Sequence, residues 1–219
     1  MMHLTRNVLI SGMIALAALT ARAYDNGDWQ FWNTDSVEYK INKQLKAKAE
    51  TEFYFGDDMS EWYYRHIDLG LSYKATDWLE LGANYRYLQE KKSDEWMDEN
   101  RPHGNATLSG TLGPVTLSDR NRFEYRIREA ADDFWRYRNR FRVSAAKGWT
   151  RFQLQPYVDD EVFYDFNEHE RNQNRVSAGV VTRWASMFKT ELYYMLQSSK
   201  KSGEWNDTNI LGLNLKFTF

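Results

Sequence analysis

The stretch FWRYRNRFRVSAAKGW, residues 134–149, has an arginine at every second position over most of its length. Successive side chains of a β-strand point to opposite faces, so a strand here would carry guanidinium groups on one face only. The other face would be mostly apolar. Such a strand fits either a basic surface patch or the inner wall of a barrel. The arginines are Arg136, Arg138, Arg140 and Arg142, and the alternating residues are Tyr137, Asn139, Phe141 and Val143.

The neighbouring runs carry charge with the same period of two. In a barrel with polar faces inward, these side chains would crowd one wall of the lumen. One interpretation is a narrow channel whose cationic wall selects small anionic solutes. The other is an interior filled by ion pairs, since buried charge is costly unless it is paired. The expected lumen-lining residues are Arg120, Arg122, Glu124, Arg126, Arg136, Arg138, Arg140, Arg142, Asp159, Glu161 and Arg175.

The first 23 residues have the pattern of a cleaved signal peptide. Val8 to Thr20 is an apolar run shorter than a typical transmembrane helix. The following Ala21-Arg22-Ala23 offers small residues at the positions that a signal peptidase recognises. We therefore expect residues 1–23 to be removed and residues 24–219 to form one exported domain.

The composition of the mature chain argues against a nucleic-acid partner. Without Arg6 and Arg22 the chain keeps 27 basic and 31 acidic residues, a net charge of −4. It has no cysteine, so no disulfide holds it together. It is polar on average yet contains 35 aromatic residues, nine of them tryptophan. An exported β-barrel has this composition, because the hydropathies of its apolar face and its polar face offset each other in the average over the chain.

A period of two resolves the mature chain into eleven strand-like runs, with no competing helical period. This pattern predicts a single all-β domain. The connections are 3, 6, 4, 14, 3, 7, 4, 9, 3 and 9 residues long, so short and long alternate as in outer-membrane barrels. The runs are 29–41, 45–55, 62–73, 78–89, 104–111, 115–127, 135–146, 151–163, 173–183, 187–197 and 207–219.

Three features predict that the apolar faces point outward to lipid. The apolar faces are nearly free of charge, aromatic residues gather near strand ends, and the chain closes on the alternating strand LGLNLKFTF, residues 211–219. Phe219 would then be the C-terminal signal read by the barrel-assembly machinery. A run of twelve residues at ~3.4 Å per residue and a tilt near 45° climbs about 29 Å, enough for the apolar band.

The sequence therefore predicts an antiparallel up-and-down transmembrane β-barrel of 10–12 strands in the bacterial outer membrane. Outer-membrane lipid and lipopolysaccharide would surround it. Ten strands from residue 45 onward make an even barrel, which leaves the run 29–41 to be placed. Either residues 24–33 add a short twelfth strand, or this segment lies in the lumen or pairs unusually.

Two other classes were weighed. A soluble lipocalin-like binding barrel would turn its apolar face inward around a ligand. A lipid-modifying barrel enzyme would need a histidine beside a serine. His66 lies six residues before Ser72, His103 lies six before Ser109, and neither interval lets the two side chains meet. We expect no catalytic residue, no cofactor and no metal site.

Three further segments carry a family resemblance: RNRFEYRIREAADDFWRYRNRFRV (120–143), LQPYVDDEVFYDF (154–166) and ERNQNRVSAGV (170–180). With the closing strand, they resemble the bacterial domain-of-unknown-function family 2490. Its members look like exported outer-membrane β-barrels, and the family has no established activity. The resemblance implies a location and a fold but no mechanism. The small porins for acidic oligosaccharides are a more distant look-alike, also with arginine-lined lumens.

Overall fold

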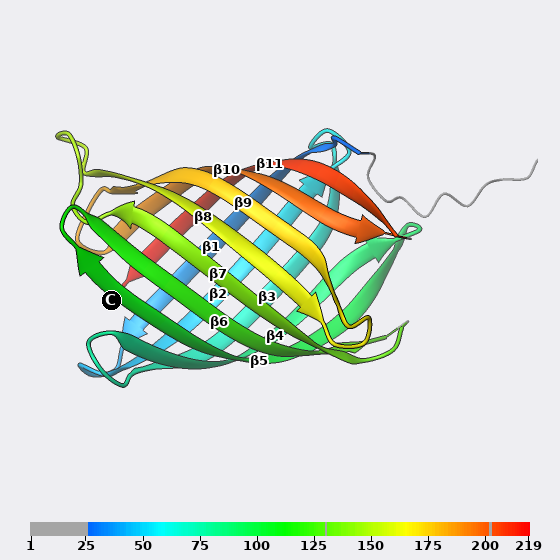
Figure 1. Ribbon diagram of the computed structural model, residues 1–219, viewed down its shortest axis with the longest axis horizontal. Helices are drawn as coiled ribbons and strands as arrows, with labels where there is room; N and C mark the ends of the chain where they lie inside the picture. The colour runs from blue at the N-terminus through cyan, green and yellow to red at the C-terminus, as the bar shows by residue number, and fades with distance from the viewer. Residues whose placement is uncertain (1–25, 130, 202) are drawn as a thin grey trace, which may run out of the picture.

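The computed structural model shows one closed β-barrel of eleven strands (Figure 1). The structure describes residues 26–129, 131–201 and 203–219, so the expected signal peptide lies outside the described residues. Within the described part of the chain, no helix is long and apolar enough to cross a membrane. The strands are β1 (Trp29–Lys40), β2 (Leu45–Gly56), β3 (Glu61–Lys74), β4 (Leu79–Lys92), β5 (Glu95–Leu112), β6 (Val115–Arg128), β7 (Phe134–Ala145), β8 (Leu154–Asp165), β9 (Glu170–Arg183), β10 (Phe188–Lys201) and β11 (Glu204–Thr218).

The barrel closes through a parallel pair of strands, β1 and β11. All other neighbours are antiparallel, and an odd number of up-and-down strands leaves the first and last running the same way. The closing ladder is continuous from Trp29↔Asn209 to Glu38↔Thr218. The run 29–41 therefore pairs unusually, as one of the three expectations had it. The closure leaves no exposed sheet edge.

The expected alternation of short and long connections is wrong. At the end where β11 finishes, the Phe219 end, the connections include the longest one, residues 146–153. At the opposite Trp29 end, residues 90–103 were expected to form a 14-residue loop. Instead β4 and β5 extend into this segment and are joined by a two-residue turn. Ser93 and Asp94 both have positive φ, 48° and 70°, as a tight hairpin turn requires. Residues there alternate without an apolar face, so periodicity gave no sign of a strand.

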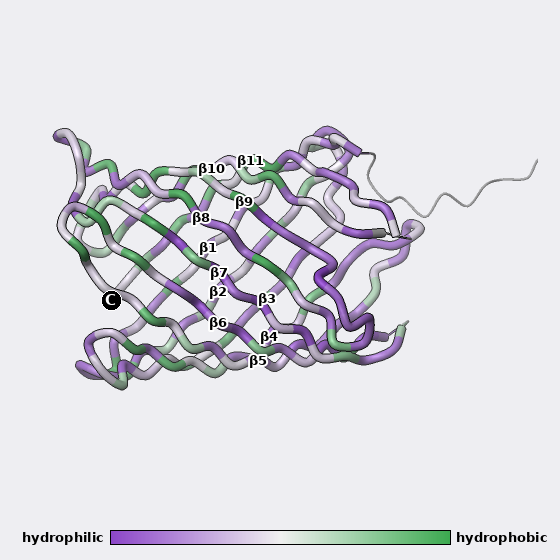
Figure 2. Tube along the Cα trace, in the orientation of Figure 1, coloured by the Kyte–Doolittle hydropathy of each residue, from purple (hydrophilic) through white to green (hydrophobic). Residues whose placement is uncertain are grey.

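The alternation within each strand divides the barrel into an outer and an inner face. Outward residues such as Leu69, Leu71 and Leu192 are about half exposed, whereas their inward neighbours Asp68 and Glu191 are buried. Hydrophilic residues gather at the Trp29 end (Figure 2), beyond the more apolar middle of the wall. The outer face therefore has an apolar surface of the kind that lipid covers.

One part of the outer face is polar, against the expectation of nearly charge-free apolar faces. Five outward side chains of β6 to β9 lie near the middle of their strands and hydrogen-bond one another. Asn139 Nδ2 donates to Asp119 Oδ1 at 2.5 Å, and Asn174 Nδ2 donates to Asp160 Oδ1 at 2.7 Å. Asn121 completes the patch through bonds to Asp119 and Asn139. Mutual hydrogen bonding lowers the cost of removing these groups from water.

Cysteine pairs test the closing register, because the natural chain contains no cysteine. Phe31→Cys with Leu211→Cys places two thiols on paired positions of β1 and β11, within disulfide reach. We expect an intramolecular disulfide in the folded protein, detected by mass spectrometry of the linked peptides. Phe31→Cys with Leu215→Cys, four residues out of register, serves as the control. Equal linking of both pairs, or of neither, would contradict the parallel closure.

Candidate functional site

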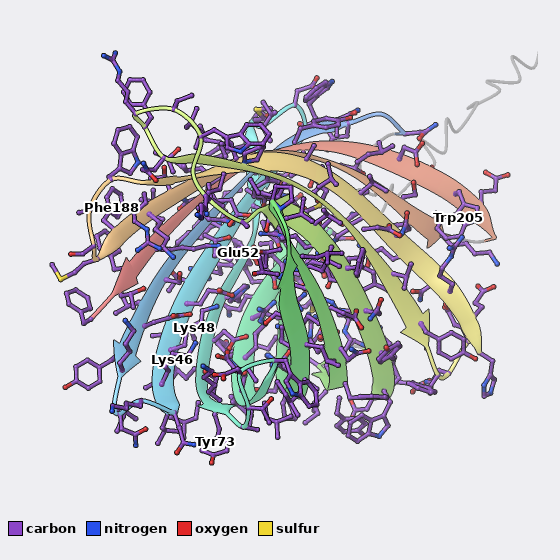
Figure 3. The ribbon with its side chains drawn as sticks, turned by 60° about the vertical axis from the view of Figure 1, so that its left-hand side comes forward. Lys46, Lys48, Glu52, Tyr73, Phe188 and Trp205 are labelled. Carbon is purple, nitrogen blue, oxygen red and sulfur yellow. The ribbon has the colours of Figure 1, made fainter. Side chains whose placement is uncertain are left out.

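The inner face of the barrel surrounds a cavity of about 390 Å³. Ten of the eleven residues expected in the lumen line this cavity, and the eleventh, Glu124, is completely buried behind them. In Figure 3 the side chains of Lys48 and Glu52 lie inside the curve of the sheet, whereas Tyr73 and Phe188 lie at its outer edge. The cavity is therefore a polar chamber bounded by nearly every strand.

Two buried glutamates anchor the arginines of β7. Glu124 on β6 pairs with Arg136 and accepts an ion pair from Arg138 Nη1 at 3.5 Å. Glu161 on β8 accepts Arg138 Nη2 at 2.9 Å and Arg120 Nη2 at 2.6 Å. Glu124 also lies 4.0 Å from Arg101 Nη1 on β5, so each carboxylate bridges arginines of different strands and satisfies several guanidinium donors at once. These pairs knit β6, β7 and β8 together across the wall.

A second network lies towards the Phe219 end. Arg142 Nη2 pairs with Asp159 Oδ2 at 2.6 Å, and its Nη1 pairs with Glu191 Oε1 at 3.1 Å. Glu191 also pairs with Lys216. The ring of Tyr157 lies under the Arg142 guanidinium, 3.8 Å from its centroid to Cζ, a cation–π contact. This network joins β7 and β8 to β10 and β11 across the interior.

Not every arginine has a carboxylate partner. Arg120 and Arg140 are direct neighbours across β6 and β7, where like charges repel. Within the described residues, Arg140 makes no ion pair of 4.0 Å or less. The Nε of Arg122 donates to Asn105 Oδ1 at 2.7 Å, a neutral partner. This segment of the wall therefore keeps an unbalanced positive charge.

The residues that line the cavity also carry more positive than negative charge. Twelve of its thirty residues are arginine or lysine, and six are aspartate or glutamate. In a low-dielectric enclosure such an excess creates a positive potential that attracts anions. The interior thus has ion pairs in its wall and more cationic than anionic side chains along its cavity.

An aromatic stack narrows the Trp29 end of the interior. Trp32, Tyr54 and Tyr64 come from β1, β2 and β3, with ring centroids 3.7 Å and 4.2 Å apart along the stack. All three are buried and line the cavity. Arg175 lies over the free face of Trp32, with its Cζ 4.9 Å from the ring centroid. We call these three rings the aromatic stack.

Several functional residues were missed in the sequence. Glu99 and Arg101 were expected in a loop, but they lie on β5, where Glu99 accepts Arg101 and Arg126 at 2.7 Å each. The alternation of Glu99, Arg101 and His103 was the available signal, and Pro102 between them argued against a strand. Pro102 lies on the outward side, opposite Tyr85.

The histidines lie beside carboxylates. His66 contacts Glu50 and Glu52, and His103 contacts Asp68. In the described part of the chain, neither ring hydrogen-bonds a serine. His66 Nδ1 instead contacts the Tyr64 hydroxyl at 3.1 Å, and His103 Nδ1 the carbonyl of Arg101 at 3.3 Å.

Fold and interior define a closed β-barrel with a charged lumen. The sequence matches the family described as Protein of unknown function (DUF2490) over residues 29–209, and the chain belongs to that family. No curated protein matches the sequence. A solved structure, the anion-selective porin from Comamonas acidovorans, is similar at 12% identity and a TM-score of 0.38. The match covers 77% of this chain and 55% of the porin, so the chain spans about half the porin's length.

Removing the Glu124 carboxylate should destabilise the barrel. Glu124→Gln leaves Arg136 without its buried counter-charge and Arg138 with Glu161 alone, and a broken buried pair costs about 3–5 kcal/mol. We expect a lower urea midpoint for unfolding of the refolded barrel in detergent, followed by tryptophan fluorescence. Glu204→Gln, an exposed change at the start of β11, is the control. Equal midpoints for the two variants would show that the Glu124 pairs contribute little.

Proposed function

We propose that this protein is an outer-membrane barrel whose lumen admits small anionic solutes. The single observation that carries the proposal is the two-to-one excess of cations over carboxylates in the cavity lining. Surplus charge on the wall of a narrow polar path favours solutes of the opposite sign. The role is one of transport or binding rather than catalysis.

The outer face supports a membrane location. Large hydrophobic side chains remain exposed on strand after strand, and an aqueous protein rarely leaves such a continuous apolar surface uncovered. Outer-membrane lipid and lipopolysaccharide would cover it. Trp78, Trp149 and Trp184 lie in connections at the Phe219 end, where interfacial aromatics belong. Phe219, which ends the chain there, would be read by the barrel-assembly machinery.

The cavity limits the size of the solute. Its volume of about 390 Å³ suits a small carboxylate, a phosphate or one acidic sugar unit rather than a long oligomer. The aromatic stack further narrows the Trp29 end. We therefore infer a slow, selective path rather than a wide aqueous pore.

A structural barrel is the second candidate, favoured by the ion pairs that cross the interior between Arg142 and Glu191. Conductance across a planar bilayer separates the two functions. A folded barrel, verified by heat-modifiable migration on a gel, should conduct in small steps if the lumen is a path. Absence of any step at high salt would rule out the path and leave the structural role.

Reversing the charge of Arg140 should weaken anion selectivity. Arg140→Glu removes a surplus cation and places a carboxylate opposite Arg120. We expect the chloride-over-potassium permeability ratio, from the reversal potential in a salt gradient, to fall by about two-fold or more. Lys147→Glu makes the same charge change on the exposed 146–153 connection and should leave the ratio nearly unchanged. An unaltered ratio in Arg140→Glu would count against a path along this wall.

Truncating the aromatic stack should widen the path. Trp32→Ala removes the indole that stacks on Tyr54 and should raise the single-channel conductance. Trp149→Ala is the matched control, because it removes a tryptophan side chain that is 61% exposed at the Phe219 end. Losing a buried tryptophan costs about 3–5 kcal/mol, so folding of the variant is checked first by gel migration. A folded Trp32→Ala barrel with unchanged conductance would place the narrowest point elsewhere.

A further inference from the structure

Two histidines and two carboxylates converge inside the wall formed by β2, β3 and β5. Glu50 comes from β2, His66 and Asp68 from β3, and His103 from β5. The ligand atoms of Glu50, His66 and Asp68 lie within 4.8 Å of one another. His66 Nε2 is 3.5 Å from Glu50 Oε1, and His103 Nε2 is 3.6 Å from Asp68 Oδ2.

The neighbours of Nδ1 bear on which nitrogen of each ring has a free lone pair. His103 Nδ1 lies 3.3 Å from the carbonyl of Arg101, which can only accept, so this Nδ1 carries the hydrogen and a neutral ring keeps the lone pair on Nε2. His66 Nδ1 lies 3.2 Å from the Glu52 carboxylate and 3.1 Å from the Tyr64 hydroxyl, which can donate or accept. When His66 Nδ1 donates to Glu52, its Nε2 also keeps the lone pair.

Both Nε2 atoms are buried, and neither makes a hydrogen bond. The two imidazole side chains have no exposed surface. Buried polar atoms are nearly always paired, so two such atoms aimed at neighbouring carboxylates call for a specific partner. A cation among Glu50, His66 and Asp68 is such a partner for His66, because it accepts lone pairs from the nitrogen and from both carboxylates.

We propose that Glu50, His66 and Asp68 bind a divalent transition-metal ion of the Zn²⁺ type, with His103 beside Asp68. Tetrahedral zinc with bonds of about 2.0–2.2 Å holds its ligand atoms roughly 3.3–3.6 Å apart, and His66 Nε2 lies 3.5 Å from Glu50 Oε1. A mixed nitrogen and oxygen set suits zinc and its neighbours, whereas calcium and magnesium prefer oxygen alone.

The surrounding side chains support the ligands. A carboxylate that holds the outer nitrogen of a metal-binding histidine is the usual second partner in such sites, and Glu52 has that position at His66. Asn84 Nδ2 donates to Asp68 Oδ1 at 2.7 Å and fixes that carboxylate. Arg86 Nε donates to Asp68 Oδ2 at 2.9 Å, and this oxygen keeps a second lone pair.

The charge of the cluster also favours a cation. The three carboxylates of Glu50, Glu52 and Asp68 pair with two cations, Arg86 and Lys48. One negative charge is left for an entering metal ion. The cluster reaches from β2 to β5, which lies next to β6, and Glu50 lines the same cavity as the arginines.

Zinc binding by the folded, detergent-solubilised protein tests the proposal. We expect one Zn²⁺ per chain by isothermal titration calorimetry, with Co²⁺ giving the visible absorption of a low-symmetry nitrogen–oxygen site. His66→Gln should weaken zinc binding by more than about 100-fold, and His103→Gln and Glu52→Gln, which change residues beside the ligands, by about 10–100-fold. His169→Gln changes an exposed histidine between β8 and β9 and should bind as the wild type does.

Nitrogen-15 NMR of histidine-labelled wild-type protein gives a measure that needs no variant. Added Zn²⁺ should shift the Nε2 resonances of His66 and His103 and leave His169 unchanged. The proposal is overturned if the wild type binds no zinc, or if His169→Gln weakens binding as much as His66→Gln does. It is also overturned if both buried rings are doubly protonated and insensitive to zinc, since they would then simply pair with Glu50 and Asp68.

Discussion

Every second residue of every strand points into a space only a few side chains wide, and this crowding governs the rest of the structure. A charge brought there leaves bulk water, so it must find a counter-charge or keep access to an anion. Glu124 and Glu161 show the first solution, since each bridges arginines from neighbouring strands. Arg140 shows the second, because it faces the cavity and makes no ion pair of 4.0 Å or less in the described residues, although Glu161 lies opposite it on β8. The most buried charges of the interior are therefore paired, whereas the residues that line the cavity carry an excess of positive charge.

Closure imposes a second constraint, on the backbone. An edge strand would expose unpaired amide and carbonyl groups, which neither lipid nor a crowded solution tolerates. Eleven strands can close only through one parallel pair, and β1 supplies it by pairing with β11 on one side and β2 on the other. The hydrogen-bonded ladder remains continuous across this parallel pair, because the inward and outward residues of 29–38 lie beside inward and outward residues of β11.

The period of two resolved the chain into eleven strand-like runs, and the apolar, nearly charge-free character of the alternate faces favoured an inward direction for the arginines. Parity decides which face a side chain occupies, and parity can be read from Arg136 to Arg142 without a structure. The register between strands cannot be read in this way. Polar alternation beyond the apolar band looked like loop, so the first residues of β5 were missed together with Glu99 and Arg101. The outward polar patch was missed for a related reason, since Asp119 and Asp160 gain their partners from other strands.

The metal ligands and His103 escaped sequence analysis because they form no motif along the chain. His66 and Asp68 are two residues apart, but Glu50 and His103 come from strands that only the sheet register brings alongside. The same register separates charge across the lumen, with Glu50, Glu52 and Asp68 on one wall and the surplus arginines on β6 and β7. An anion drawn to the arginines would face those carboxylates across the cavity. A divalent ion bound among them would neutralise that opposing charge. Metal binding at these carboxylates would therefore strengthen the attraction of the anion to the arginines.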